Sequence, residues 1–173
     1  MSSIIQNATS LGITYNASSL SQYSSYKPEN VFIDDDFSCF YSSDTEIQNQ
    51  WWQVSFSKPV EISSYIIRTG ASYGTRPTSW LVMSSFDNLT WNFVDVMIGK
   101  NISGNYQRFY LHAPINCFHF RIILKENTNQ NNYLFFTFFD CFGGLGSNQT
   151  KKVLCYCNTF YTRSLLSMKV LIS

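Results

Sequence analysis

Short runs in which apolar and polar residues alternate constrain the fold of this 173-residue chain more than any other feature. In the run Trp52-Gln53-Val54-Ser55-Phe56 the three apolar side chains share one face of an extended strand, and the run stops at Lys58-Pro59. Further runs with strand character cover 62–69, 80–85, 91–97, 107–112, 117–125 and 133–142, separated by segments rich in Gly, Asn, Ser, Thr and Pro. The sequence therefore predicts an all-β sandwich or barrel.

One turn can be predicted in more detail. Asp87-Asn88 lies between two runs that carry aromatic residues, and both residue types tolerate a left-handed backbone. We therefore expect a hairpin over 84–91.

The domain organisation follows from where the alternating pattern begins and ends. The length suits one domain, and a content of 45% hydrophobic residues is enough to fill one core. Residues 11–143 are the predicted domain, and residues 1–10 are expected to be a flexible N-terminus. After Gly143-Gly144 the alternation stops, so 144–173 is expected to be a poorly ordered tail with at most one weak helical piece.

The charge balance argues against nucleic acid as a partner. The formal net charge is +1, and Lys and Arg form no cluster that would neutralise a phosphate backbone. Apolar residues nowhere approach the run of about 20 that a membrane span needs, so no transmembrane segment is expected.

Two features give opposite indications of the compartment. The first residues lack the basic and apolar regions of a secretory signal, and the odd number of cysteines, five, favours reduced thiols; both predict a cytoplasmic protein. Five sequons point instead to an extracellular protein whose N-terminus is incomplete; they lie at Asn7, Asn16, Asn88, Asn101 and Asn148.

The order of landmarks along the chain resembles the coagulation factor 5/8 type C (discoidin) domains. The opening Lys27-Pro28-Glu29-Asn30-Val31-Phe32-Ile33-Asp34-Asp35-Asp36 is similar to their "P-x-N-x-x-D-G-D" segment, and Trp51-Trp52-Gln53-Val54-Ser55-Phe56 is similar to the strand that follows. Ser84-Ser85-Phe86-Asp87-Asn88-Leu89-Thr90-Trp91 resembles the "S-x-D-G-x-x-W" hairpin. Phe118-His119-Phe120-Arg121-Ile122 and Phe138-Phe139-Asp140-Cys141-Phe142-Gly143 resemble the last two strand motifs.

This resemblance implies an eight-stranded jelly-roll sandwich of the galactose-binding-like group. Members of that group bind sugars, phospholipid head groups or proteins, some of them in cell adhesion. The departures from the family pattern include Phe40 in place of the usual Trp, and Ser55 and Ser57 in place of the usual Asp and Gly.

The resemblance also implies a structural calcium ion, although no cofactor is required. Three hard oxygen donors in the triplet 34–36 suit Ca²⁺. Carried over by position, Asp34 and Asp36 are the side-chain candidates, with Ser38 as a further ligand and Asp140 as the partner from the last strand. In the alternative, Asp34 caps the following turn and the other two carboxylates of the triplet are solvated.

The ligand of sugar-binding members lies on the loops that follow the first strands. Here those loops contain Tyr23, Tyr26, Phe37, Tyr41 and Tyr73. Arg68 and Arg76 flank the loop at 70–75, where an arginine beside Tyr73 can hydrogen-bond and stack on a sugar. The candidate ligand-binding residues are therefore Tyr26, Tyr41, Arg68, Tyr73 and Arg76. In the alternative, the tyrosines pack in the core and the arginines are solvated.

The sequence gives no support for catalysis or for zinc. His112 and His119 show no metal-ligand spacing, one residue instead of two separates Cys155 from Cys157, and no glycine-flanked serine elbow is present. We therefore expect a non-catalytic recognition module that binds a carbohydrate or a similar polar ligand. The alternatives are an intracellular protein-interaction domain of the adaptor type and, third, a membrane-surface binder.

Overall fold

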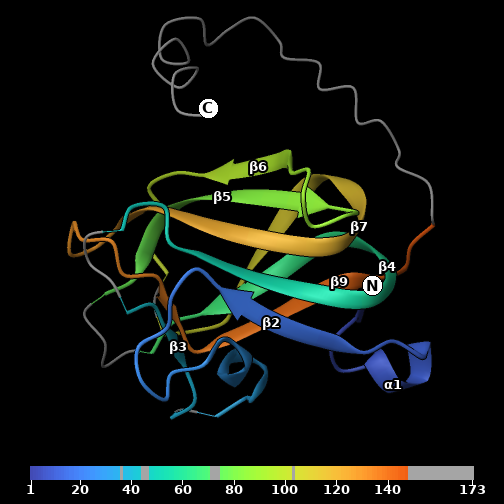
Figure 1. The fold of residues 1–173 in the computed structure, drawn as a ribbon, viewed down its shortest axis with the longest axis horizontal. Helices are drawn as coiled ribbons and strands as arrows, with labels where there is room; N and C mark the ends of the chain where they lie inside the picture. The colour runs from blue at the N-terminus through green and yellow to red at the C-terminus, as the bar shows by residue number, and fades with distance from the viewer. Residues whose placement is uncertain (36, 44–46, 71–74, 103, 148–173) are drawn as a thin grey trace, which may run out of the picture.

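The computed structural model describes residues 1–35, 37–43, 47–70, 75–102 and 104–147. This part of the chain is an antiparallel β-sandwich with little helix (Figure 1), which confirms the predicted class. One sheet has seven strands in the order β1-β9-β4-β7-β5-β6, with β2 paired to β4 outside that order, and a second sheet consists of β3 and β8.

Short helical segments interrupt the strands only in the first third of the described chain. In chain order the elements are β1 (Ser2–Ser3), α1 (Ala8–Leu11), β2 (Tyr15–Ser19), the 3-10 helix η1 (Pro28–Phe32), β3 (Phe40–Tyr41), β4 (Trp51–Arg68), β5 (Pro77–Ser85), β6 (Asn92–Met97), β7 (Gln107–Asn127), β8 (Phe135–Phe136) and β9 (Phe138–Leu145).

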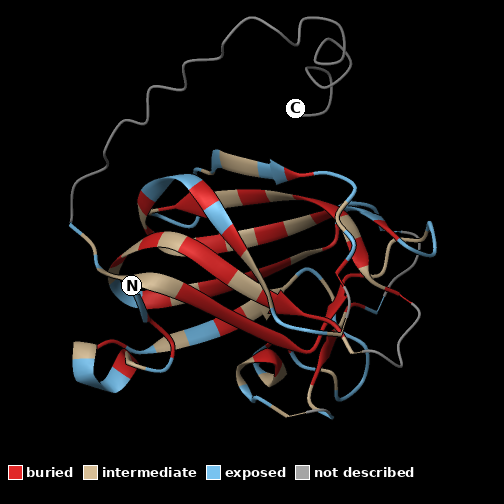
Figure 2. Ribbon diagram, turned by 180° about the vertical axis from the view of Figure 1, so that it is seen from behind, coloured by how far each residue is buried: buried red, intermediate tan, exposed pale blue. Residues whose placement is uncertain are grey.

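The alternation in β4 explains how the core is filled. Trp52, Val54 and Phe56 are all buried on one face, as the sequence predicts. Trp52 packs against Phe139 of β9 with ring centroids 4.6 Å apart, and its indole N–H donates to the carbonyl of Pro28 over 3.0 Å. Burial is concentrated inside the sandwich (Figure 2), and most of the largest fully buried side chains are aromatic.

Two pairs of predicted strands are single long strands. The runs at 52–56 and 62–69 belong to β4, apart from Thr69, and those at 107–112 and 117–125 belong to β7. Pro59 lies where the β4–β7 register shifts between Ser55 and Val60, so its missing N–H interrupts a ladder that is already irregular. The prediction that the first strand stops at Lys58-Pro59 is therefore wrong.

The predicted hairpin is confirmed. β5 pairs with β6 up to Ser84 and Asn92, and Asn88 in the turn has a left-handed backbone with φ of +60°. The Asp87 carboxylate accepts hydrogen bonds from the amides of Leu89 and Thr90 over 2.9 and 2.7 Å, which lowers its pKa. The turn is thus closed by its own side chain.

The N-terminal residues, predicted to be flexible, are part of the fold. Ser2 and Ser3 pair with Gly143 and Phe142 of β9, and the amide of Ile4 donates to the carbonyl of Cys141 over 2.8 Å. Ile4 is completely buried. The physical reason is that the Ile4 side chain belongs to the hydrophobic core, and its burial outweighs the polar character of its neighbours.

At the other end of the chain, β9 continues to Leu145, two residues past the predicted boundary at 143, and the amide of Gly146 donates to the carbonyl of Pro59 over 2.9 Å. Residues 148–173, most of the predicted tail, lie outside the described residues. Among the described residues, no helix combines the length and the apolar character needed to cross a membrane.

The two ends of the sandwich carry different connections. β3 and the end of β2 lie at one end, whereas α1 and the turn between β5 and β6 lie at the other (Figure 1). The loops that contain most of the candidate ligand-binding residues are at the β3 end.

Candidate functional site

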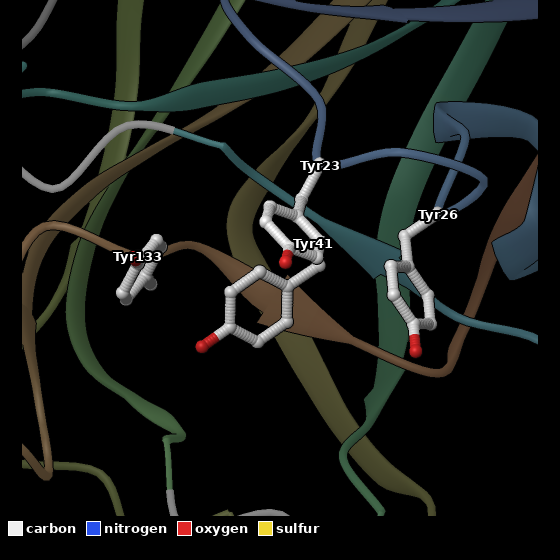
Figure 3. Close-up of a pocket in the computed structure, with 4 residues that line it drawn as sticks. All are labelled: Tyr23, Tyr26, Tyr41 and Tyr133. Carbon is white, nitrogen blue, oxygen red and sulfur yellow. The ribbon is translucent and has the colours of Figure 1, made fainter.

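Four tyrosines surround a pocket of about 280 Å³ at the β3 end of the sandwich (Figure 3). Tyr23 and Tyr26 come from the loop between β2 and η1, Tyr41 from β3, and Tyr133 from the loop between β7 and β8. We call these four residues the tyrosine cradle.

The rings of the cradle are in contact with one another. Tyr23 and Tyr26 are stacked, with centroids 6.1 Å apart and an interplanar angle of 22°. Tyr41 lies between them and Tyr133: its centroid is 6.2 Å from that of Tyr23 and 4.9 Å from that of Tyr133. The cradle is therefore a connected aromatic surface.

Backbone hydrogen bonds hold the first three tyrosines together. The amide of Tyr23 donates to the carbonyl of Tyr41 over 2.8 Å, and the amide of Tyr41 donates to the carbonyl of Tyr26 over 3.4 Å. The side-chain amide of Asn30 donates to the carbonyls of Ser25 and Cys39 over 3.1 and 3.0 Å, which joins both limbs of the loop. The loop thus has a defined shape without regular secondary structure.

The pairing of β3 with β8 brings the fourth tyrosine to the other three. Tyr41 pairs with Phe135, and the hydroxyl of Ser42 accepts a hydrogen bond from the amide of Leu134 over 2.9 Å. Tyr133 immediately precedes this pairing, so its position depends on a contact between distant parts of the chain.

The described residues that line the cradle are all phenols. Burial raises the pKa of Tyr41 above its ordinary value, an effect that a hydrogen bond with the Thr75 side chain partly opposes. The Tyr41 hydroxyl therefore stays protonated and can donate a hydrogen bond. Each phenol offers a polar tip on an apolar ring.

Of the predicted ligand-binding residues, Tyr26 and Tyr41 lie in the cradle. Tyr73 lies outside the described residues. Arg76 does not line the pocket: its amide donates to the Thr128 hydroxyl over 3.0 Å, and its carbonyl accepts from the Thr128 amide over 2.9 Å.

Arg68, the remaining predicted contact, also does not line the pocket and is 9% exposed. Its guanidinium donates to the Thr137 hydroxyl over 3.2 Å and to the Tyr106 hydroxyl over 3.1 Å, and it also donates to the carbonyl of Asp35. Arg68 therefore holds loop segments together, and its contact with a ligand stays a prediction.

The predicted calcium ligands have separate partners. The Asp34 carboxylate lies 3.6 Å from Arg68 and accepts from the Tyr106 hydroxyl, whereas Asp140 accepts from the Ser3 hydroxyl over 3.0 Å. The Ser38 hydroxyl donates to Asp35 over 2.9 Å, and Asp36 lies outside the described residues. Within the described ranges, no group of three His, Cys, Asp or Glu side chains is arranged to hold a metal. The calcium site stays a prediction.

The alternative without metal predicts that Asp34 caps the turn, and this is wrong. Asp35 closes the turn: its carboxylate accepts from the amides of Phe37 and Ser38 as well as from the Ser38 hydroxyl. These bonds lower the pKa of Asp35, the amide of Ser38 contributing most.

Tyr133 is the residue of the cradle that the sequence does not single out. Tyr133 follows a run of polar residues at 126–132 and shows no pattern that sets it apart from the other tyrosines. Only the β3–β8 pairing, which joins distant parts of the chain, brings it against Tyr41.

Similar solved structures share this fold. CBM32-3 from a family 31 glycoside hydrolase of Clostridium perfringens is 15% identical, over 75% of this chain and 90% of that chain, with a TM-score of 0.66. The family 32 CBM of C. perfringens NanJ, in complex with galactose, is 13% identical over 80% of this chain and 96% of that chain, with a TM-score of 0.66. CpGH89CBM32-5 of the same organism, in complex with GalNAc-β-1,3-galactose, is 10% identical over 82% of this chain and 100% of that chain, with a TM-score of 0.68.

A search of curated proteins found no match. The family model of the F5/8 type C domain matches residues 14–137, which include β2 to β8 and all four tyrosines of the cradle. Because this match spans well over half of the 173 residues, the chain belongs to the F5/8 type C domain family.

Proposed function

We propose that this chain is a non-catalytic carbohydrate-recognition module that binds a neutral sugar in the tyrosine cradle. The observation that carries the proposal is the gathering of four tyrosines from three separate segments around one pocket. Most of the largest buried side chains of this protein are aromatic, whereas these four rings line a pocket that is open to solvent. Aromatic rings in such a position are suited to binding a ligand.

The chemistry of the cradle matches a sugar. An aromatic ring packs on the apolar face of a pyranose, and phenol hydroxyls can exchange hydrogen bonds with sugar hydroxyls. The four lining residues include no acidic or basic side chain, which favours a neutral sugar over a uronic acid. The volume of about 280 Å³ is at the lower end of typical ligand pockets, which suits one sugar residue at the end of a chain.

The similar structures support this proposal through their fold. Two of them are complexes with galactose and with GalNAc-β-1,3-galactose. Another is a family 89 glycoside hydrolase of C. perfringens, of which this chain covers 15%. In that enzyme the matched part is a small portion of a longer protein, consistent with a binding module instead of a catalytic unit.

A protein-interaction role is the second candidate. It is favoured by exposed apolar side chains on and beside β6, an edge strand of the seven-stranded sheet in the described part of the chain. These side chains are Leu89, Phe93, Val96 and Ile98. They lie on other elements than the cradle, so the two candidates can be tested separately.

Calorimetric titration of the full chain with galactose, N-acetylgalactosamine, glucose and mannose tests the proposal. Tyr23→Ala should weaken binding of the preferred sugar roughly tenfold, the loss expected for one stacking contact of about 1.4 kcal/mol. Tyr23 is 53% exposed, so this substitution should leave the fold intact.

Tyr110→Ala is the matched control. Tyr110 lies on β7, is 64% exposed and does not line the cradle, so its removal should leave sugar affinity unchanged. If the unaltered chain binds none of the four sugars, or if both variants bind as the unaltered chain does, the proposal is wrong.

A further inference from the structure

Among the described residues that line the cradle, Tyr133 is the one on its side of Tyr41. Tyr41 lies in the middle of Figure 3, with Tyr133 on one side and Tyr26 on the other. Tyr41 contacts Tyr133 at 4.9 Å and Tyr26 at 6.3 Å between ring centroids. Because three tyrosines come from the N-terminal half and only Tyr133 from the C-terminal half, the place of Tyr133 determines how far the pocket extends on that side.

The turn that carries Tyr133 is built around one side chain, Asn127, at the end of β7. The Asn127 side-chain oxygen accepts from the amides of Asn129 and Asn131, both over 3.1 Å. Its side-chain nitrogen donates to the Asn131 side-chain oxygen over 2.6 Å and to the carbonyl of Tyr133 over 2.9 Å. Both lone pairs and both N–H groups of the carboxamide are therefore used.

A second set of hydrogen bonds fastens the same turn to the segment that begins β5. The side-chain nitrogen of Asn129 donates to the Thr75 hydroxyl over 2.8 Å, and the Thr128 amide donates to the Arg76 carbonyl over 2.9 Å. Thr75, which is buried, also contacts the hydroxyl of Tyr41. The turn and the centre of the cradle thus share a support.

Asn127 is 4% exposed, so none of its hydrogen bonds can be replaced by water without rearranging the turn. A carboxylate has the same shape but cannot donate, and it would face the carbonyl of Tyr133 and the side-chain oxygen of Asn131. The position of Tyr133 depends on the two donors of this amide.

We propose that the 128–133 turn sets the ligand specificity of the cradle, with Tyr133 as the specificity-determining wall and Asn127 as the positioning residue that holds it. This inference rests on the proposed function, since it concerns the same pocket. The inference names the residues that decide how long a sugar the pocket accepts. With Tyr133 displaced, the pocket is open on one side, and the affinity for a disaccharide increases relative to the affinity for a monosaccharide.

Titration of the full chain with galactose and with lactose tests the inference. Tyr133→Ala and Asn127→Asp should each weaken galactose binding roughly tenfold and lower the ratio of the lactose Kd to the galactose Kd. In the Tyr133→Ala background, Asn127→Asp should change neither Kd more than about twofold, because its effect passes through the absent ring.

Asn88→Asp is the matched control. Asn88 lies in the turn between β5 and β6, at the opposite end of the sandwich, and its substitution should leave both affinities unchanged. Should Asn127→Asp fail to fold, Asn131→Ala takes its place, because Asn131 accepts from both the Asn127 side chain and the Tyr133 amide and is only half-buried.

The outcomes separate the two proposals. If the unaltered chain binds neither of these sugars nor any of the other three monosaccharides, the carbohydrate proposal fails and this inference with it. If the chain binds one of those three instead of galactose, that sugar and a disaccharide that ends in it replace galactose and lactose in the test. If the unaltered chain binds but the ratio of the two Kd values stays constant in both variants, only the inference is overturned. An equal loss from Asn127→Asp with and without the Tyr133 ring would also overturn it, because the effect would then be a general loss of structure.

Discussion

Arg68 connects three segments at the end of the sandwich that carries the tyrosine cradle. It contacts the carbonyl of Asp35 ahead of β3, the hydroxyl of Tyr106 ahead of β7, and the hydroxyl of Thr137 between β8 and β9. Its guanidinium carbon also lies 4.9 Å from the centroid of the Tyr106 ring. A guanidinium has five donors in a fixed plane, which suits a side chain that must hold several carbonyl and hydroxyl oxygens at once.

Asp140 gives a prediction at the residue scale. It is buried, and burial raises its pKa above the ordinary value of 3.8 despite hydrogen bonds from Ser3 and Cys141. The ionised form is thus disfavoured in the folded state, so the associated stability is present below pH 3.8 and is lost as pH rises through the raised pKa. Asp140→Asn, which stays neutral, should raise the melting temperature at pH 7, and the gain should vanish in acid.

Asp35 provides the opposite control. Its pKa is lowered by the amides of Ser38 and Phe37, so its stabilisation is present above pH 3.8 and is lost as pH falls through the lowered pKa. Asp35→Asn should therefore lower the melting temperature at pH 7 and have little effect in acid. The melting temperatures of both variants are measured from about pH 2.5 to about pH 7, roughly the range over which carboxylates titrate. Parallel pH profiles of the two variants would contradict this assignment.

At the scale of elements, the contact between β4 and β9 is unusually close at Gly143. A Cβ atom placed on Gly143 would lie 1.8 Å from the carbonyl oxygen of Glu61 and 2.9 Å from its carbonyl carbon. Both are backbone atoms of the central strand β4, which also pairs with β2 and β7 and so cannot move aside freely.

Gly143→Ala should lower the free energy of unfolding by about 3 kcal/mol or more, since the overlap forces two paired strands apart. Gly144→Ala is a matched control on the next residue, because a Cβ there meets no atom within 4 Å. Urea denaturation followed by tryptophan fluorescence compares the two. Equal losses would mean that the glycines act through backbone freedom and not through this contact.

The long strands β4 and β7 give the sandwich its frame at the same scale. Each combines two predicted strands, and their mutual pairing runs from Trp51 to Ile67 with register shifts after Ser55 and Ile62. A bulge bends a strand without ending it. The local pattern marks the irregularity correctly but does not show whether the chain turns there or continues.

At the scale of the whole molecule, the arrangement is a paired framework with loops gathered at one end. Those loops hold the cradle and also the segment 34–38 with its predicted calcium ligands. In the described residues Asp34 is bonded to Arg68 and Tyr106, and Asp140 to Ser3, so these carboxylates already have partners.

A thermal melt of the full chain with Ca²⁺ and with EDTA tests the predicted calcium. If the site exists, Ca²⁺ at a hundredfold excess over its Kd should stabilise the fold by about 2.7 kcal/mol. The shift should be absent in Asp34→Ala. It should be retained in Lys125→Ala, because the exposed Lys125 amine donates to the Asn49 side chain and contacts none of the predicted calcium ligands in the described structure. Identical melts of the unaltered chain in Ca²⁺ and EDTA would contradict the calcium prediction.

The sequence by itself determined the class, the family and the most local features of this protein. The alternation in 52–56 places its apolar residues in the core, and Asp87-Asn88 closes the predicted hairpin. Two of the tyrosines that the sequence marks as candidates, Tyr26 and Tyr41, line the pocket of the cradle. These features depend on residues that are neighbours in the chain, so a period of two or a pair of turn residues is enough to specify them.

The tertiary structure alone decided the rest. It joined the β3 and β8 strands and so brought Tyr133 to the cradle, it paired β1 with β9, and it turned Arg68 inward to Thr137 and Tyr106. Each of these contacts links segments far apart in the chain. Their formation depends on which surfaces remain to be buried and which polar groups remain to be satisfied once the sheet has assembled, and no local pattern of residues records that.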